Sequence, residues 1–108
     1  MFISIHCNGV ESKTAEGLQA YYYDSTDQKL ANGIASRFRK FDDCVVKPDT
    51  TTRHKQIGVL RTASTKPSVL VEMGFQSNPD DLKNIDSSKF RSDTMKALAD
   101  SIEAYWGL

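Results

Sequence analysis

The sequence runs Pro67-Ser68-Val69-Leu70-Val71-Glu72-Met73 in the stretch that decides the fold. A nearly continuous apolar run of this length is typical of a central strand that is covered on both faces. Glu72 is the anomaly, because it places a carboxylate at the end of an otherwise apolar strand. The stretch therefore predicts the middle of a sheet and makes Glu72 a candidate for chemistry.

Two more strands are expected upstream of this run. Residues 1–6 are apolar and β-branched and end on His6, so a buried strand would carry this imidazole to the edge of the sheet. Residues 17–23, Gly-Leu-Gln-Ala-Tyr-Tyr-Tyr, have the composition of a strand. A shorter strand is expected near Val45, and a short strand or turn is expected over residues 57–61.

Three segments have helical signals. The first is expected to begin at a cap on Ser25 or Thr26, because apolar residues then recur at steps of three and four. These apolar residues are Leu30, Ile34, Phe38 and Phe41. Asn78 is expected to cap a short second helix, and a third is expected over residues 88–106 with Gly107 as its stop. Strands that alternate with amphipathic helices predict a single α/β domain.

Composition argues against several classes of protein. The chain has 108 residues with 14 basic and 14 acidic side chains, so its net charge of zero offers no bulk attraction for nucleic acid or an anionic membrane surface. The sequence contains no run typical of a membrane span, and residues 1–8 lack the features of a secretory signal peptide. Cys7 and Cys44 have no Cys-x-x-Cys spacing, which indicates neither a zinc knuckle nor a redox pair and leaves a disulfide open.

His6 and Glu72 would both lie at the ends of strands. If their strands are parallel neighbours, these ends meet at one edge of the sheet, where open α/β sheets form their sites. Neutral imidazole is a good zinc ligand, and a carboxylate beside the attacking water can take its proton and pass it to a leaving nitrogen. That combination suits metal-assisted amide hydrolysis. From these two residues alone, a hydrogen-bonded structural histidine and a solvated glutamate remain open as alternatives.

Longer motifs narrow these alternatives. The segment Ser4-Ile5-His6-Cys7-Asn8 is similar to the Ser-(Ile/Leu)-His-x-Asn motif of the zinc-dependent N-acetylmuramoyl-L-alanine amidases, and residues 17–23 are similar to the strand that follows it in that family. Val59-Leu60-Arg61, together with the block from Pro67 to Asp80, resembles the Val-Leu-Arg and Val-Leu-Val-Glu-x-Gly-Phe segments of the same family. The order and spacing of these motifs agree over nearly the whole chain.

The resemblance implies a fold, an activity and roles for individual residues. The implied fold is a single α/β domain whose mixed, mainly parallel sheet is flanked by helices and which binds one zinc ion. The implied activity is hydrolysis of the amide bond between N-acetylmuramic acid and L-alanine in peptidoglycan. His6 would then be a zinc ligand and Glu72 the catalytic acid/base, with Asn8, Arg53 and Arg61 as residues that contact substrate.

The resemblance also implies that part of the family's site is missing. The family supplies a second zinc-binding histidine in a Gly-His-Gly turn and a glutamate on a helix, both upstream of its Ser-Ile-His segment. We therefore expect residues 1–108 to be the C-terminal part of the catalytic domain, without the N-terminal strand and helix of the family fold. Cys7 is not expected to substitute as a ligand, because alternation along the strand points it away from His6. An uncovered sheet edge is expected to favour self-association.

Two functions follow from this reading. One is a peptidoglycan hydrolase of the cell envelope or the extracellular space, either an exported autolysin or an endolysin released by a phage. The other is a truncated, non-catalytic module that binds cell wall or pairs with a complete amidase.

Overall fold

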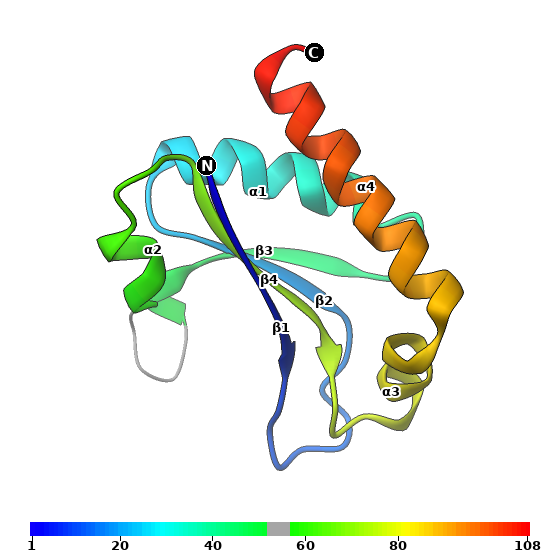
Figure 1. Cartoon of the computed structure of the whole chain (residues 1–108). Coiled ribbons are helices and arrows are strands. Elements are labelled where there is room, and N and C mark those ends of the chain that lie inside the picture. Colours follow the sequence, from blue (N-terminus) through cyan, green and yellow to red (C-terminus); the bar gives the residue numbers. More distant parts are fainter. Residues whose placement is uncertain (52–56) are drawn as a thin grey trace.

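The valine-rich run forms β4, Ser68–Phe75, which lies inside the sheet. A computed structural model of the chain describes residues 1–51 and 57–108, and within them the sheet has four strands in the order β1-β4-β2-β3 (Figure 1). On one side β4 pairs in parallel with β1, Phe2–Asn8, and on the other side it pairs antiparallel with β2, Leu18–Tyr22. β3, Cys44–Pro48, is parallel to β2. The predicted mixed, mainly parallel sheet is confirmed.

Two helices cover one face of this sheet. They are α1, Ser25–Phe38, and α4, Ser88–Trp106, which pack against each other as well as over the strands (Figure 1). Alternate strand positions point into this layer, because successive side chains of a strand face opposite sides of a sheet. The largest fully buried members of this core are Leu18, Leu30, Ile34, Phe38, Val69 and Val71.

The first helix begins differently from our prediction. Its N-cap is Asp24 rather than Ser25 or Thr26, because Asp24 and Asp27 accept hydrogen bonds from each other's backbone N–H groups in a capping box. Phe41 lies beyond the end of α1 and is 39% exposed, so the apolar face of the helix ends at Phe38.

The prediction of a strand or turn over residues 57–61 is wrong. Gly58–Thr62 forms a short helix, α2, which follows a 3-10 turn at Asp49–Thr51. Leu60 of α2 is fully buried against Tyr21 and Leu70, on the sheet face opposite α1 and α4. The burial of one leucine in a tertiary contact selects a helix that the short sequence pattern does not specify.

The chain after β4 folds as the turn residues dictate. Asn78 accepts hydrogen bonds from the N–H groups of Asp80 and Asp81 and so caps α3, Pro79–Asp86, which confirms the predicted cap. Asp81 is buried, and its carboxylate accepts from the N–H groups of Gly17 at 2.9 Å and Phe75 at 2.8 Å. α4 ends at Gly107, which has a φ of 75° as a helix-stopping glycine often does.

Gly74 has a backbone conformation that requires glycine. Its φ is 130°, and a Cβ atom added there would lie 3.2 Å from the Cβ of Asp81. The glycine therefore allows the end of β4 to approach α3 closely enough for Asp81 to accept the N–H of Phe75.

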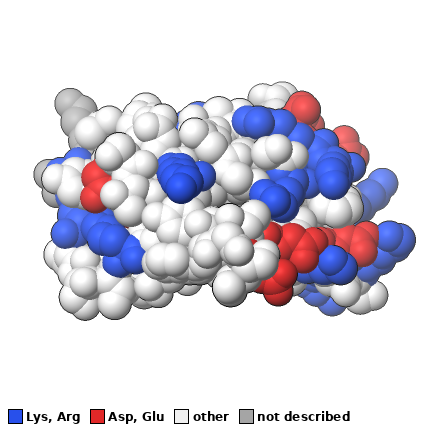
Figure 2. All heavy atoms as spheres, turned by 90° about the horizontal axis from the view of Figure 1, so that it is seen from above, with Lys and Arg blue, Asp and Glu red and all other residues white. Residues whose placement is uncertain are grey.

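The outer surface carries charges of both signs. Figure 2, seen from above, shows Lys and Arg next to Asp and Glu toward the right-hand end, and uncharged atoms over much of the rest of this face. Both cysteines are free, with Cys7 exposed and Cys44 buried. Burial raises the pKa of the Cys44 thiol to about 11. Within the described ranges, no helix has the length and apolar character needed to cross a membrane.

Candidate functional site

His6, Glu72 and Gln19 lie side by side across three strands. In the sheet register, His6 of β1 is the parallel partner of Glu72 of β4, and Gln19 of β2 is the antiparallel partner of the same glutamate. Directly paired residues point to the same face of a sheet. These three side chains, which we call the polar row, therefore share the face opposite α1 and α4. The condition that the strands of His6 and Glu72 are parallel neighbours is met.

Glu72 is the chemically distinctive member of the polar row. It is half-buried, and its Oε2 atom is out of contact with solvent and has no hydrogen-bond partner among the residues that the structure describes. Burial raises the pKa of this carboxyl above its usual range, and the neighbouring His6 offsets part of that rise. A glutamate in this state exchanges a proton closer to neutral pH than an exposed one does, as an acid/base catalyst must.

His6 is exposed beside this carboxyl. Its Nε2 atom shares a 2.7 Å hydrogen bond with the hydroxyl of Ser4, two residues earlier on the same face of β1. The tautomer of the ring decides which of the two atoms donates the hydrogen. A metal ion would bind the nitrogen that carries no proton, so Ser4 is placed to influence which nitrogen is available.

Asn8 and Tyr21 join the polar row through Gln19. The side-chain carbonyl of Gln19 accepts from Nδ2 of Asn8 at 3.2 Å and from the hydroxyl of Tyr21 at 2.8 Å. Tyr21 and Gln19 are each 8% exposed. Burial, and then the charge of Glu72, raise the pKa of the Tyr21 hydroxyl, so it stays a hydrogen-bond donor over a wide pH range.

Arg61, one of the two predicted arginines, has its partners outside the polar row. Arg61 donates from Nε and Nη2 to the buried carboxylate of Asp49, at 2.7 and 3.0 Å, and its guanidinium lies 4.4 Å from the ring centre of Tyr23. Burial raises the pKa of the Asp49 carboxyl, but its hydrogen bonds with Arg61 and Ile57 outweigh burial and hold that pKa below its usual range. Arg61 thus has a structural partner, and its contact with substrate stays a prediction. Arg53 lies outside the described residues.

The described residues do not by themselves fit a complete zinc site. A catalytic zinc ion takes three protein ligands and keeps one open position. Residues 1–51 and 57–108 contain no group of three or more His, Cys, Asp or Glu side chains placed to hold a metal ion. Cys7 faces the α4 side with Ile5 and Met73, away from His6, as the alternation of the strand predicted. His6 is therefore the single expected ligand that the structure places next to Glu72.

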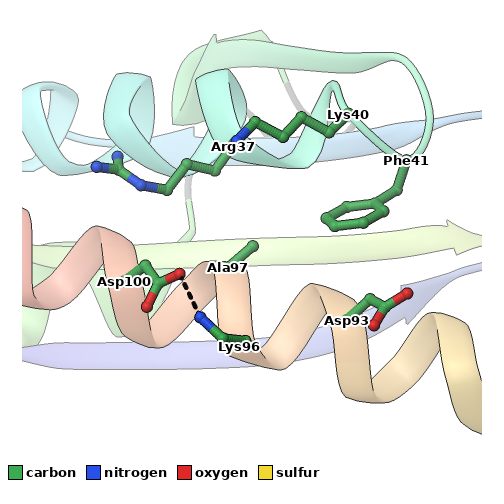
Figure 3. Close-up of a pocket in the computed structure, with 7 residues that line it drawn as sticks. All are labelled: Arg37, Lys40, Phe41, Asp93, Lys96, Ala97 and Asp100. Carbon is green, nitrogen blue, oxygen red and sulfur yellow. Dashed lines mark hydrogen bonds and ion pairs between the residues drawn. The ribbon is translucent and has the colours of Figure 1, made fainter.

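Away from the polar row, a hollow of about 290 Å³ lies between α1 and α4 (Figure 3). Arg37 and Lys40 border it from the side of α1, and Lys96 pairs with Asp100 at 3.0 Å along α4. Both helices cover the sheet face opposite the polar row, and the charges around the hollow largely pair or face solvent. We therefore place the candidate site at the polar row and not in this groove.

The sequence interpretation did not assign roles to Gln19 and Tyr21. The signal was present, because Leu18 and Ala20 alternate with Gln19 and Tyr21 along a strand that is buried on both faces. A buried glutamine at the centre of a sheet requires hydrogen-bond partners, so it marks a polar site.

Known proteins match nearly the whole of this chain. The sequence profile of the N-acetylmuramoyl-L-alanine amidase family, Amidase_3, matches residues 1–104. The chain is 30% identical over 105 residues to the probable cell wall amidase LytH of Staphylococcus epidermidis, and 30% identical over 110 residues to the germination-specific N-acetylmuramoyl-L-alanine amidase of Bacillus subtilis. These alignments cover 97% and 98% of this chain, but 35% and 44% of the two relatives.

A solved structure extends the similarity to three dimensions. The catalytic domain of CwlV, an amidase from Bacillus (Paenibacillus) polymyxa var. colistinus, superposes with a TM-score of 0.84 at 26% identity. The match covers 98% of this chain and 57% of that domain. The profile match and the shared fold lead to one conclusion: the chain belongs to the N-acetylmuramoyl-L-alanine amidase family.

Proposed function

We propose that this chain carries the acid/base half of a peptidoglycan amidase site, which hydrolyses the amide bond between N-acetylmuramic acid and L-alanine. The observation that carries the proposal is the Glu72 carboxyl, which has one buried oxygen without a partner and lies in register with His6. A buried acceptor without a partner is costly, so its presence here indicates a group that a substrate or a reacting water would satisfy.

The proposed chemistry assigns one proton path to Glu72. The ionised carboxylate takes a proton from the attacking water as the new carbon–oxygen bond forms. The same proton then passes to the alanine nitrogen as the carbon–nitrogen bond breaks, which regenerates the carboxylate. The raised pKa of Glu72 suits this second transfer, since its protonated form persists closer to neutral pH.

Zinc enters the proposal through His6 alone. We propose His6 as one ligand and expect the other ligands to come from residues that the structure does not describe or that lie outside this chain. A zinc ion, when bound, polarises a carbonyl and lowers the pKa of water. We place Asn8, Arg53 and Arg61 on the substrate side of the proposal, and residues 1–108 as the C-terminal part of the catalytic domain.

The proposed substrate also fixes a proposed location. Peptidoglycan lies outside the cytoplasmic membrane, so the enzyme would act in the cell envelope or the extracellular space. An exported autolysin and a phage-released endolysin both satisfy this condition.

Release of amino groups from purified peptidoglycan tests the proposal. The 108-residue chain and the longest polypeptide encoded by the reading frame that contains it are assayed for new L-alanine amino termini, with and without a zinc chelator. We expect release by the longer form, loss of most of that release after chelation, and little or none from the 108 residues alone. Release of new reducing sugar ends in place of amino termini would contradict the proposed bond.

The incomplete ligand set favours one second candidate, a non-catalytic module that binds cell wall. Within the described part of the chain the structure shows no three-ligand cluster, so binding without cleavage is a consistent outcome. Co-sedimentation with insoluble peptidoglycan separates the two. Binding that is insensitive to chelator, without any release of amino termini by either form, would support the module.

We also propose that the 108-residue chain associates with a second copy through β1. This strand pairs only with β4 among the described strands, and its Ile5 is 49% exposed beside an apolar groove of about 190 Å³. Cys7, Met73, Phe90 and Met95 also line this groove. An edge strand with unpaired backbone groups and apolar neighbours is a template for pairing with another strand.

Sedimentation measurements under reducing conditions test this association. We expect dimers at concentrations of about 100 μM, on the order of the affinity of a small interface, and a monomer for Ile5→Lys. Val45→Lys is the matched control, because Val45 is 48% exposed on β3, the other edge strand. Equal dissociation by both substitutions would place the contact elsewhere.

A further inference from the structure

Gln19 makes a bridge between residues of two strands that are not neighbours in the sheet. Its side-chain carbonyl accepts from Asn8 of β1 and Tyr21 of β2, although β4 lies between β1 and β2. We call Asn8, Gln19 and Tyr21 the Gln19 bridge. It passes over the strand that carries Glu72, on the same face as that carboxyl.

The hydrogen bonds of the bridge determine one another. The N–H of Gly9 donates to Oδ1 of Asn8 at 3.0 Å, so the Asn8 amide turns its Nδ2 group toward Gln19. Gln19 must then present its carbonyl oxygen to Asn8, and the same oxygen takes the hydroxyl hydrogen of Tyr21. The donor that each amide oxygen accepts from thus decides which way that amide points. This decides between the oxygen and nitrogen positions of the Asn8 and Gln19 amides, which are otherwise hard to tell apart.

The bridge matters because β1 has few side-chain hydrogen bonds to the rest of the sheet, beyond its backbone pairing with β4 and the bond from the N–H of Gln76 to the carbonyl of Asn8 at 2.8 Å. The strand lies at the edge of the sheet, most of its side chains are exposed or half-buried, and its register with β4 shifts between His6 and Asn8. Among the described residues, the bond from Asn8 to Gln19 is the single side-chain hydrogen bond that joins β1 to another strand or helix. This bond fixes the end of β1, two residues after His6. β1 is the strand that lies beside Glu72.

We propose that Gln19 is a positioning residue of the amidase site, which fixes the end of β1 through Asn8 so that His6 stays in register beside Glu72. The inference rests on the proposed function. Gln19 acts without touching substrate, because its side chain is 8% exposed and its carbonyl oxygen is already occupied by two donors.

Hydrogen exchange in the 108-residue chain tests the bridge without any need for activity. In Gln19→Leu, we expect the side-chain NH₂ resonance of Asn8 to move and the backbone amides of residues 6–8 to exchange at least about tenfold faster. Gln28→Leu is the matched control, since Gln28 also bonds a tyrosine hydroxyl, that of Tyr22 at 3.2 Å, but lies on α1 away from the site. Unchanged exchange at residues 6–8 in Gln19→Leu would overturn the proposal, whether or not the protein cleaves peptidoglycan.

Kinetics in the form that cleaves peptidoglycan tests the role in the reaction. For Gln19→Leu we expect kcat to fall roughly 10- to 100-fold, the scale of a small misplacement of reacting groups, with KM nearly unchanged. Asn8→Ala is expected to cause at least as large a loss, because we also place Asn8 on the substrate side. The double variant Asn8→Ala with Gln19→Leu is expected to lose little more than Asn8→Ala alone, because both substitutions break the same link. Additive losses, or a normal kcat in Gln19→Leu, would overturn the role.

A variant on the donor side of the bridge separates positioning from general loss of structure. Asn8→Ala leaves the buried side chains of Gln19 and Tyr21 in place, so we expect faster exchange at residues 6–8 and unchanged exchange in α1 and α4. If Gln19→Leu does not fold, Asn8→Ala still decides the question. Unchanged exchange at residues 6–8 in Asn8→Ala, or faster exchange throughout the chain, would contradict the bridge.

Discussion

Glu72→Gln is expected to abolish peptidoglycan hydrolysis and, at the same time, to make the chain more stable at neutral pH. The glutamine keeps the size of the side chain but can neither take a proton from water nor return one to the leaving nitrogen. Loss of a general acid/base costs roughly 10²- to 10⁴-fold in rate. The measurement is kcat for release of L-alanine amino termini, in whichever form of the protein cleaves peptidoglycan.

The gain in stability depends on pH in a defined direction. Because burial raises the pKa of Glu72 in the folded chain, folding is penalised once the carboxyl ionises. Below the ordinary glutamate pKa of about 4.3 the group is protonated in both folded and unfolded chains, so glutamate and glutamine should differ little. As pH rises through the raised pKa, the free energy of unfolding of Glu72→Gln should exceed that of the parent by up to about 1 kcal/mol. This is the low end of the cost of a buried polar atom without a partner, because the carboxyl is half-exposed.

Urea unfolding of the two proteins between pH 4 and 8 measures this difference. Glu103→Gln serves as the control, because Glu103 is exposed on α4 and its substitution should leave stability unchanged across this range. A Glu72→Gln protein that is less stable than the parent at pH 7 would mean that the ionised carboxylate has a stabilising partner. That result would contradict the assignment of Glu72 Oε2 as a buried acceptor without a partner, the observation on which the proposed function rests.

The sequence predicted the elements whose signals are local. Asn78 followed by Pro79 is a complete helix start, and Gly107 is a complete stop, because each acts through hydrogen bonds or backbone angles within a few residues. The run at residues 68–73 predicted the inner strand in the same way. His6 and Glu72 were expected at strand ends, but β1 continues to Asn8 and β4 to Phe75, so both residues lie inside their strands. The parallel pairing of these strands makes them neighbours.

Contacts between distant segments could not be predicted in this way. The cap at Asp24 displaces the expected cap at Ser25 or Thr26 because the capping box includes Asp27, which is also bonded to the start of β4. α2 forms because Leu60 is buried against the sheet, which a five-residue pattern does not reveal. The role of Gln19 depends on a strand order, β1-β4-β2, that no local signal encodes. Sequence patterns thus identified the catalytic candidates, but not the residues whose contacts fix the strands that carry them.

Asp27 illustrates how strongly such a distant contact is expected to stabilise the fold. Its side chain is fully buried, yet one oxygen accepts from the N–H of Ser68 at 2.7 Å, and the other accepts from Nζ of Lys66 at 3.1 Å. The N–H groups of Tyr23 and Asp24 also donate to it, each at 3.3 Å. A single carboxylate therefore joins the start of α1 to the start of β4, the strand that carries Glu72.

We expect Asp27→Ala to destabilise the chain by about 3 kcal/mol, because several backbone N–H groups lose their acceptor and each buried donor left without a partner costs about 1 to 3 kcal/mol. The substitution leaves the N–H of Ser68 buried without an acceptor and Lys66 with Asp24 as its remaining carboxylate partner, at 3.3 Å. Against a total stability of roughly 5 to 15 kcal/mol for a small domain, this loss is large enough to populate unfolded chain. Urea unfolding should show a midpoint lower by more than about 1 M.

Asp100→Ala is the control, since its pair with Lys96 is exposed and should contribute at most about 0.5 kcal/mol. Similar losses for the two variants would show that the buried carboxylate does not join α1 to β4 in the way its hydrogen bonds indicate.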